Sequence, residues 1–352
     1  MPTTPDISVV VPTRNRAVAL RRLIPSLQRC DADGLSWELI IVDNGSSDDT
    51  SAVCRAAAKS FGAGQLRYVE ERVPGLHAGR HRGAREAASG VVAYLDDDVE
   101  VSPAWLRGFT ESFADPGIEI VGGPVLPRYR ADPPAWVAST WKRRPDGTVW
   151  CGYLGLLKSG DVDHEIEPWF VWGGNMAIRR ETLLRLRGFH PDGMPWELRR
   201  YRGDGETGLS LKATKAGVRA WHCPRAVVYH DVAAERLTKD YFFKRSFLQG
   251  ISDSFTAVRA QGGPVPPSHE SPKSRIRSRM SRWLRHFDWS SQGAIDATLR
   301  AQLRAAQQKG FQYHQREIAS DPALLAWVLR EDFLEDAAPG ADAPNWTHGQ
   351  QS

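Results

Sequence analysis

Residues 91–98 read Val-Val-Ala-Tyr-Leu-Asp-Asp-Asp, a short apolar run that ends in three acids. The apolar part is typical of a buried β-strand. Asp96, Asp97 and Asp98 therefore follow the carboxyl end of a strand, which is the edge where open α/β sheets bind their ligands. Neighbouring carboxylates repel each other, and a divalent cation would hold them together. Oxygen ligands favour magnesium, calcium or manganese over zinc. A solvated acidic turn that caps the next helix is the alternative.

Strand-like runs and helical stretches alternate from residue 7 to about residue 122. The strand-like runs are Ile7 to Val11, Trp37 to Val42, Leu66 to Val69, Val91 to Leu95 and Ile118 to Val121. This alternation predicts an α/β fold with a doubly wound, mostly parallel sheet flanked by helices. Pro25 lies inside the first helical stretch, and we expect it to shorten or kink that helix.

Composition and charge fit a soluble enzyme of the cytoplasm. The net charge of +4 over 352 residues is too small to indicate nucleic-acid binding. The four cysteines have neither paired nor metal-ligand spacing, which is typical of reduced thiols. The first strand is not preceded by an apolar leader, and no apolar run approaches about 18 residues. We therefore expect neither export by a signal peptide nor a membrane-spanning segment.

A second acidic turn follows the second predicted strand, at the same edge of the sheet. A ligand that lies across these strand ends would contact both Asp43 and Asp98. Three motifs, taken in order, resemble the opening motifs of the family 2 glycosyltransferases: Val9 to Asn15, Ile41 to Thr50 and Tyr94 to Asp98. The resemblance covers roughly residues 7 to 250. It implies the GT-A fold, a nucleotide-activated sugar, a divalent metal such as Mg²⁺ or Mn²⁺, and inversion at the anomeric carbon.

The resemblance assigns one group of residues to the nucleotide of the donor. It makes Asp43 the partner of the base and places Pro12, Thr13 and Arg14 along the nucleoside. A carboxylate accepts the imide proton of uracil or thymine, which favours a UDP-sugar or a dTDP-sugar. Arg80 belongs to a basic segment that begins a helix, and we expect it to face the donor phosphates. A solvated basic helix face is the alternative for that segment.

A second group is assigned to the metal and the diphosphate. Asp98 is the expected metal ligand, and Asp96 is expected to contact the metal or the ribose. Asp97 is the least defined of the three donor-site acids. His230 ends a later strand and is placed on the metal or the diphosphate, although a histidine in that position is as commonly structural.

A third group is assigned to the sugar and the acceptor. A glycine turn resembles the family segment beneath the acceptor pocket and contains Trp172, Gly173, Gly174 and Asn175. In many relatives a later helix begins with a Glu-Asp pair whose aspartate is the general base. Glu206 takes that position here, with Gly205 in place of the usual glutamate, and Asp204 is the second candidate base. Both acids would also cap the helix start, and capping is compatible with catalysis.

These assignments predict a single displacement in which the diphosphate leaves while Glu206 deprotonates an acceptor hydroxyl. A sugar nucleotidyltransferase would share the sheet and the metal, but residues 12–15 are not its glycine-rich phosphate loop. A phosphatase of the aspartyl-phosphate type expects threonine or valine where Glu100 stands. A non-catalytic protein that binds a nucleotide sugar stays open as an alternative, because the base motif is altered.

The domain organisation follows from where the resemblance ends. We expect a catalytic domain, a helical C-terminal extension and a disordered tail, at residues 1–260, 261–336 and 337–352. The nucleotide-binding half of the catalytic domain would end near residue 122, and residues 123–260 would form the acceptor half. The basic segment 273–287 has three interpretations: peripheral contact with the inner membrane face, packing on the catalytic domain, or a homodimer contact.

Overall fold

The computed structural model describes residues 4–62, 64–265, 290–291 and 297–334. The chain forms two compact units. One unit contains Met1–Leu126, Asp161–Asp231 and Arg330–Ser352, and the other contains Pro127–Gly160 and Val232–Leu329. The units therefore draw on both sides of the boundaries expected near residues 122 and 260, because the segment 127–160 clusters with the late helices. The expected tail and the basic segment 273–287 lie outside the described residues.

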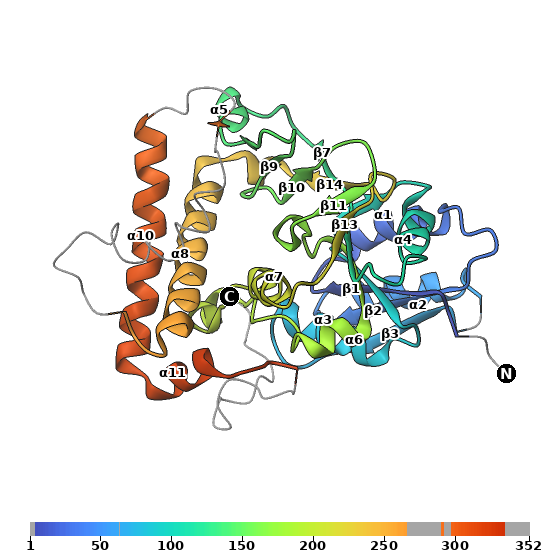
Figure 1. The fold of residues 1–352 in the computed structure, drawn as a ribbon, viewed down its shortest axis with the longest axis horizontal. Helices are drawn as coiled ribbons and strands as arrows, with labels where there is room; N and C mark the ends of the chain where they lie inside the picture. The colour runs from blue at the N-terminus through green and yellow to red at the C-terminus, as the bar shows by residue number, and fades with distance from the viewer. Residues whose placement is uncertain (1–3, 63, 266–289, 292–296, 335–352) are drawn as a thin grey trace. The chain divides into compact units, whose positions relative to one another are not determined.

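The first unit is built on an eight-stranded sheet with the order β11-β13-β6-β12-β4-β1-β2-β3. Figure 1 labels five of these strands, β1, β2, β3, β11 and β13. Its strands, in chain order, are β1 (Ile7–Thr13), β2 (Trp37–Asp43), β3 (Leu66–Glu70), β4 (Val91–Leu95), β6 (Ile120–Gly122), β11 (His164–Ile166), β12 (Asn175–Arg179) and β13 (Ala220–His222). Strands β3, β2, β1 and β4 are parallel, whereas β12 runs antiparallel between β4 and β6. The predicted α/β sheet flanked by helices is confirmed. Two of its strands run antiparallel to the others: β12, inserted beside the parallel block, and β11 at the edge next to β13.

Helices connect and cover these strands. They are α1 (Ala17–Gln28), α2 (Thr50–Ala58), α3 (Leu76–Glu86), α4 (Trp105–Ser112), α6 (Arg180–Arg185) and α7 (Glu206–Lys215). Helix α1 buries Leu20, Leu23 and Leu27, the apolar positions that recur with helical spacing. Pro25 lies in the last turn of α1, and the helix ends three residues later at Gln28. Since proline removes one backbone donor, that turn is a natural end for the helix.

A short antiparallel pair brings a late part of the chain to the acidic run. Strand β5 (Val99–Val101) follows the three acids directly and pairs with β14 (Val228–Val232). His230 lies opposite Val99 in this ladder. The backbone N–H of Asp231 also donates a 2.9 Å hydrogen bond to the carbonyl oxygen of Asp98. The pairing therefore fixes where His230 stands relative to the acids.

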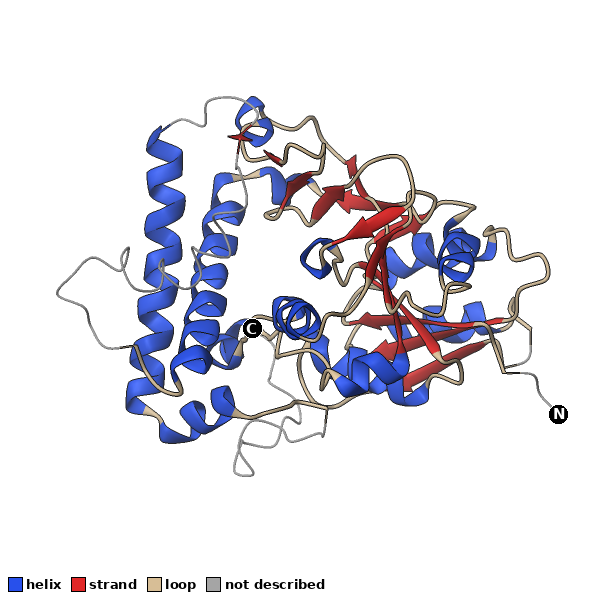
Figure 2. Ribbon diagram, viewed as in Figure 1, coloured by secondary structure: helices blue, strands red, loops and turns tan. Residues whose placement is uncertain are grey.

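The second unit consists of a small meander and long helices. Strands β8 (Lys142–Arg143), β9 (Val149–Cys151) and β10 (Leu156–Lys158) pair antiparallel, and β15 (Ser290–Ser291) pairs with β8. Helices α8 (Lys239–Gln261) and α10 (Ala297–Ser320) lie side by side, followed by α11 (Pro322–Leu329) (Figures 1 and 2). A side chain at Gly250 or Gly310 would overlap the backbone of the opposite helix, so glycine permits this close contact.

The remaining elements are short. They are the strand β7 (Val125–Tyr129), the helix α5 (Ala135–Ala138) and the 3₁₀ turns η1 (Pro168–Phe170), η2 (Trp196–Tyr201) and η3 (Ala234–Leu237). The expected helical C-terminal region is confirmed by α10 and α11, but residues 330–334 are not helical. Across the described residues, no helix combines the length and the apolar character needed to cross a membrane.

Candidate functional site

The carboxyl ends of β1, β2 and β4 meet at one edge of the sheet. Thr13 and Asp43 lie opposite each other at the ends of β1 and β2. Strand β4, which pairs with the other side of β1, ends at Leu95, directly before the acids. The Thr13 hydroxyl donates a 2.8 Å hydrogen bond to Asp97 Oδ2. The structure therefore brings together Thr13 and Asp97, which the sequence resemblance assigns to the donor and which are 84 positions apart.

Asp43 is buried at this edge, and both of its oxygens accept hydrogen bonds. The Tyr68 hydroxyl donates to Asp43 Oδ2 at 2.6 Å, and the Ser46 backbone N–H donates to Oδ1 at 2.8 Å. Burial and the neighbouring Asp43 raise the pKa of Tyr68, so its hydroxyl stays a proton donor. The sequence did not indicate Tyr68, because its contact depends on the pairing register of β2 and β3. Two fixed donors hold the Asp43 carboxylate in one orientation.

An arginine that the sequence interpretation missed lies beside the acids. Arg16 Nε is 3.7 Å from Asp97 Oδ1, and Arg16 Nη2 is 3.9 Å from Asp98 Oδ2. Arg14, which was expected at the nucleoside, is exposed. Both arginines lie at or just after the first quoted motif, so their spacing from Thr13 was visible in the sequence. What the sequence lacked was the direction in which each side chain leaves the loop.

The pKa of Asp97 lies well above that of a free aspartate. Burial and the neighbouring Asp98 raise its pKa to about 7, against the Arg16 charge and the Thr13 hydrogen bond, which lower it. An aspartate in an unfolded chain has a pKa of about 3.9. Ionising Asp97 in the folded protein is therefore unfavourable. The stability associated with its neutral form is fully present below about pH 4 and is lost as the pH rises through 7.

We expect Asp97→Asn to remove this pH dependence, because asparagine stays neutral. One pKa unit corresponds to about 1.4 kcal/mol. Relative to the wild type, the substitution should therefore raise the free energy of unfolding by about 3 kcal/mol more near pH 8.5 than near pH 5. Urea denaturation in EDTA at both pH values measures this difference. Asp33→Asn, at an exposed position, is the control and should show the same change at both pH values. A pH-independent effect of Asp97→Asn would contradict the assignment.

Asp98 and His230 contact each other at the same edge. His230 Nε2 lies 3.3 Å from Asp98 Oδ1, and both side chains are at most 10% exposed. Within the described residues, no three histidine, cysteine or acidic side chains gather into a ready-made cation site. Magnesium-type cations are commonly held by one or two carboxylates together with substrate phosphates. The donor set therefore fits a cation that a diphosphate would help to bind.

Arg80 connects the donor-side acids with the start of α7. The residue is 2% exposed, so it does not belong to a solvated helix face. Its Nη2 lies 3.6 Å from Asp96 Oδ1, and its Nη1 lies 3.7 Å from Glu206 Oε2. The guanidinium carbon is 5.0 Å from the centre of the Phe189 ring, a cation–π contact that the sequence did not reveal. The buried guanidinium of Arg80 thus lies near both Asp96, a candidate donor-binding residue, and Glu206, a candidate base.

Glu206 is the first residue of α7. The Gly173 backbone N–H donates a 2.6 Å hydrogen bond to Glu206 Oε2. Burial raises the pKa of Glu206, whereas the Arg80 charge and the Gly173 hydrogen bond lower it. A raised pKa suits a carboxylate that has to take up a proton during a reaction. The capping alternative concerns only the helix start and does not account for the contact with Arg80.

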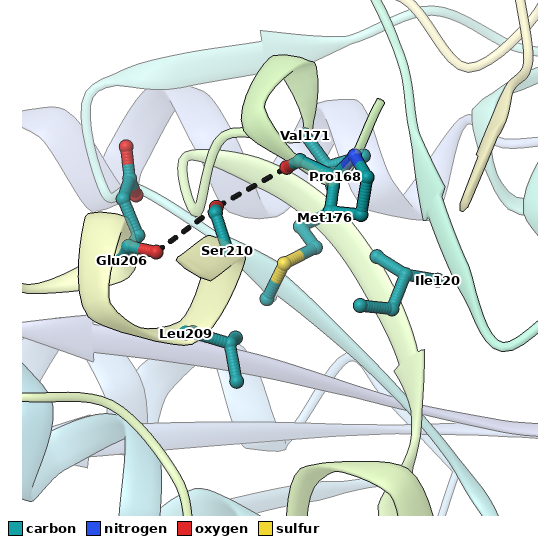
Figure 3. Close-up of a pocket in the computed structure, with 7 residues that line it drawn as sticks. All are labelled: Ile120, Pro168, Val171, Met176, Glu206, Leu209 and Ser210. Atoms are coloured by element: carbon teal, nitrogen blue, oxygen red, sulfur yellow. Dashed lines mark hydrogen bonds between the residues drawn. The ribbon is translucent and has the colours of Figure 1, made fainter. Parts of the chain in front are cut away.

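A small pocket beside α7 shows which residues this helix packs against (Figure 3). It is lined by Ile120, Pro168, Val171, Met176, Glu206, Leu209 and Ser210. The Ser210 hydroxyl bonds to the carbonyl oxygens of Pro168 and Glu206. Figure 3 shows the Glu206 side chain on the side of the helix away from Ile120. Apart from Glu206 and Ser210, the residues that line the pocket are apolar, so this side of α7 packs on apolar side chains.

The glycine turn before β12 lies against the acidic residues. Because β12 pairs antiparallel with β4, Asn175 comes opposite Leu95 and the turn reaches Asp96. A Cβ on Gly174 would lie 2.6 Å from Asp96 Oδ2, and one on Gly173 would overlap the Arg80 guanidinium. Glycine at these two positions therefore lets the acid and the arginine approach the backbone.

The neighbours of that turn differ in their surroundings. Trp172 is half-buried, and its Nε1 donates to the carbonyl oxygen of Trp169 at 3.1 Å. Asn175 is 1% exposed, and its amide is used inside the core. It accepts from Trp105 Nε1 and donates to the carbonyl oxygens of Pro124 and Ala226. In this structure Asn175 therefore ties three segments together behind the turn.

Asp204 faces a different partner from Glu206. Its Oδ1 lies 2.6 Å from His190 Nδ1, and both side chains are buried. Gly205, between the two acids, has φ +56°, and a Cβ there would lie 2.7 Å from Asp192 Oδ2. A glutamate at this position would be strained and would meet a second carboxylate. The backbone conformation thus accounts for the glycine that replaces the usual family residue.

Comparisons with known proteins identify the family of this chain and support its fold. The model of the family described as glycosyl transferase family 2 matches residues 8–186. A pre-mycofactocin glycosyltransferase of Mycobacterium tuberculosis is 30% identical over 271 residues, 75% of this chain and 50% of the relative. A validoxylamine A glucosyltransferase of Streptomyces hygroscopicus subsp. jinggangensis is 26% identical over 208 residues, 54% of this chain and 49% of the relative. The chain thus spans about half the length of these relatives.

A solved structure supports the fold. A mannosyltransferase from Pyrobaculum calidifontis, solved with GDP-Man and Mn²⁺, superposes with a TM-score of 0.50 at 18% identity. The match covers 91% of this chain and 87% of that protein. The GT-A fold expected from the sequence resemblance is confirmed.

Proposed function

Because this chain belongs to glycosyl transferase family 2, we propose that it moves a sugar from a nucleoside-diphosphate sugar to an acceptor hydroxyl with inversion. One observation carries the proposal. Arg80 contacts Asp96 on the donor side and Glu206 on the acceptor side, at 3.6 and 3.7 Å. The Arg80 guanidinium thus lies close both to Asp96, which we assign to the donor, and to Glu206, which we assign to the acceptor.

The donor nucleotide is assigned to the edge formed by β1 and β2. Tyr68 and Ser46 fix the Asp43 carboxylate, and its remaining lone pairs would accept the imide proton of uracil or thymine. We also assign the nucleoside to the residues at the end of β1, namely Pro12, Thr13 and Arg14. The imino proton of guanine suits the same acceptor, and the Pyrobaculum calidifontis mannosyltransferase was solved with GDP-Man. UDP-, dTDP- and GDP-sugars therefore all belong in a test.

The cation would be held by Asp98 and His230, with Asp96 as a further oxygen donor. A bound Mg²⁺ or Mn²⁺ supplies positive charge to the leaving diphosphate. Arg80 contributes a guanidinium at the same edge, where charge develops on the phosphate oxygens. These groups favour departure of the nucleoside diphosphate with the electron pair of the bond to the anomeric carbon.

Glu206 is the proposed general base. The acceptor oxygen attacks the anomeric carbon from the face opposite the diphosphate, and its proton passes to the Glu206 carboxylate. Arg80 and the Gly173 N–H favour the ionised form that accepts the proton. We prefer Glu206 to Asp204, because the Asp204 carboxylate is buried against His190, whereas Glu206 faces Arg80 and Asp96. Trp172 and the two glycines of the turn would line the sugar side.

The test measures binding and turnover separately on the full chain. UDP-glucose, dTDP-glucose and GDP-mannose are each supplied with Mn²⁺ or Mg²⁺, with water, glycerol or octyl glucoside as acceptors. We expect one nucleotide class to bind and to release its diphosphate in a metal-dependent reaction that inverts the anomeric centre. Binding without turnover across the panel would support the non-catalytic alternative and overturn the proposal. Retention of configuration, followed by NMR, would overturn the single displacement.

A further inference from the structure

A buried histidine and a buried aspartate lie directly before the helix that carries Glu206. His190 Nδ1 and Asp204 Oδ1 are 2.6 Å apart, and their side chains are 6% and 4% exposed. A hydrogen bond of this length between a ring nitrogen and a carboxylate is strongly directional. It fixes the orientation of Asp204, which stands two residues before Glu206. The pair takes no part in the proposed displacement, so its role lies elsewhere.

The His190 ring is seated against the first turn of α7. A Cβ at Gly208 would overlap the ring at its Nδ1 and Cε1 atoms. Only glycine at this position leaves room for the imidazole. Since Gly208 stands two residues after Glu206 on the same helical turn, the ring contacts the chain on both sides of Glu206. A displacement of the His190 ring would therefore also move the first turn of α7, which carries the Glu206 carboxylate.

Backbone hydrogen bonds join the segment at residues 190–191 to the segment at residues 203–205, directly before α7. The His190 N–H donates to the carbonyl oxygen of Gly205 at 3.3 Å, and the Gly203 N–H donates to that of Pro191 at 2.9 Å. An ion pair joins Arg202 Nη2 to Asp192 Oδ1 at 2.7 Å. With Gly205 held at φ +56°, these bonds define the direction in which the chain enters α7.

The His190 ring also contacts Phe333, near the end of the described residues. Phe333 is 4% exposed, and its ring lies 5.8 Å from that of His190 and 6.4 Å from that of His77. The next residue is anchored as well, because Arg85 Nη1 donates to the carbonyl oxygen of Leu334 at 3.0 Å. The imidazole is therefore enclosed between an aromatic ring and the α7 turn, with little room to rotate.

We propose that His190 is a positioning residue for Glu206, holding the carboxylate toward the acceptor through Asp204 and the first turn of α7. This inference rests on the proposed function, since it needs Glu206 to be the base. A displacement of about 1 Å at a reacting group costs about 100-fold in rate. A histidine that only packs the core would affect stability without a selective effect on turnover.

The test compares two variants of His190 that differ in one hydrogen bond. His190→Leu fills the volume but removes the donor to Asp204, and we expect kcat to fall about 10- to 100-fold with the donor KM unchanged within about twofold. His190→Asn places an amide N–H near the position of Nδ1, and we expect it to restore most of that turnover. Diphosphate release is followed with whichever of UDP-glucose, dTDP-glucose and GDP-mannose the enzyme uses with Mn²⁺.

A third variant leaves His190 and Asp204 in place. Gly208→Ala introduces the Cβ that overlaps the ring, and we expect it to lower kcat like His190→Leu. Thr214→Ala, at an exposed position in the last part of α7, is the matched control and should retain wild-type kcat. Crystal structures of the variants give a reading that needs no turnover. The 2.6 Å bond from Gly173 N to Glu206 Oε2 should be lost in His190→Leu and kept in His190→Asn.

The outcomes separate the two proposals. Wild-type kcat and an intact Gly173–Glu206 bond in His190→Leu would overturn the positioning role, even with Glu206→Gln inactive. Equal losses in His190→Leu and His190→Asn that follow their loss of stability would overturn it as well. Full turnover in Glu206→Gln would instead remove the proposed base, and the positioning role with it. If His190→Leu does not fold, Gly208→Ala and His190→Asn decide between these outcomes.

Discussion

Replacing Glu206 with glutamine is expected to lower kcat by about 10²- to 10⁴-fold, the usual contribution of general base catalysis. Glutamine has nearly the same shape and still accepts the hydrogen bond from the Gly173 N–H, but it cannot take up the proton of the acceptor. We therefore expect the donor affinity to change little. Diphosphate release under single-turnover conditions, together with calorimetric donor binding, measures both quantities.

Glu181→Gln is the matched control for this variant. Glu181 is an exposed glutamate in the first turn of α6, so the substitution repeats the chemical change at another helix start. The control should keep wild-type turnover, whereas a loss in both variants would point to helix capping. Full activity in Glu206→Gln combined with a large loss in Asp204→Asn would move the base to Asp204.

Replacing Asp98 with asparagine is expected to lower turnover by about 10²- to 10³-fold, because a metal contributes several kcal/mol to a developing negative charge. The asparagine side chain would keep the shape of the aspartate but lose its charge. The Mn²⁺ concentration for half-maximal activity should rise at the same time. His230 Nε2 lies 3.3 Å from Asp98 Oδ1, so His230→Gln should shift that concentration in the same direction.

The measurement is a Mn²⁺ titration of diphosphate release, with EDTA removal and re-addition of the metal. Asp33→Asn, an exposed aspartate distant from Asp98 in the sequence, is the control and should leave the titration unchanged. An Asp98→Asn enzyme with wild-type metal dependence would show that Asp98 does not hold the cation. In that case the Asp98–His230 contact would be a structural ion pair.

The parallel part of the sheet was predictable because its signals are local. Strand-like runs end in acids at Asp43 and at Asp96, and parallel strands present their carboxyl ends at one edge. Each strand, with the acid that follows it, could therefore be predicted from its own short stretch of sequence. The sequence resemblance then ordered these parts along the chain.

What the sequence did not reveal depends on pairing between distant segments. The antiparallel insertion of β12 beside β4 brings Gly173 and Gly174 against Asp96 and Arg80, and no local pattern specifies this pairing. The same holds for Asn175, whose motif suggested a pocket. Its amide bonds instead to segments that the sequence places far away.

The partners of the functional side chains were hidden for a related reason. Tyr68 meets Asp43 through the register of two strands, and His190 meets Asp204 through a loop that returns on itself. Such contacts depend on side-chain direction, which a residue's type does not determine. Arg16 is intermediate, because it directly follows a recognised motif from which only Arg14 was chosen.

The position of Arg80 has a consequence for engineering this enzyme. One guanidinium nitrogen lies near a donor-side acid and another lies near the proposed base, within a buried environment. A substitution at Asp96 made to accept a different sugar nucleotide would release Arg80 toward Glu206 and favour the ionised carboxylate. Substrate choice and the working pH range would therefore change together. A library that aims to alter one without the other needs compensating changes at Arg80 or Phe189.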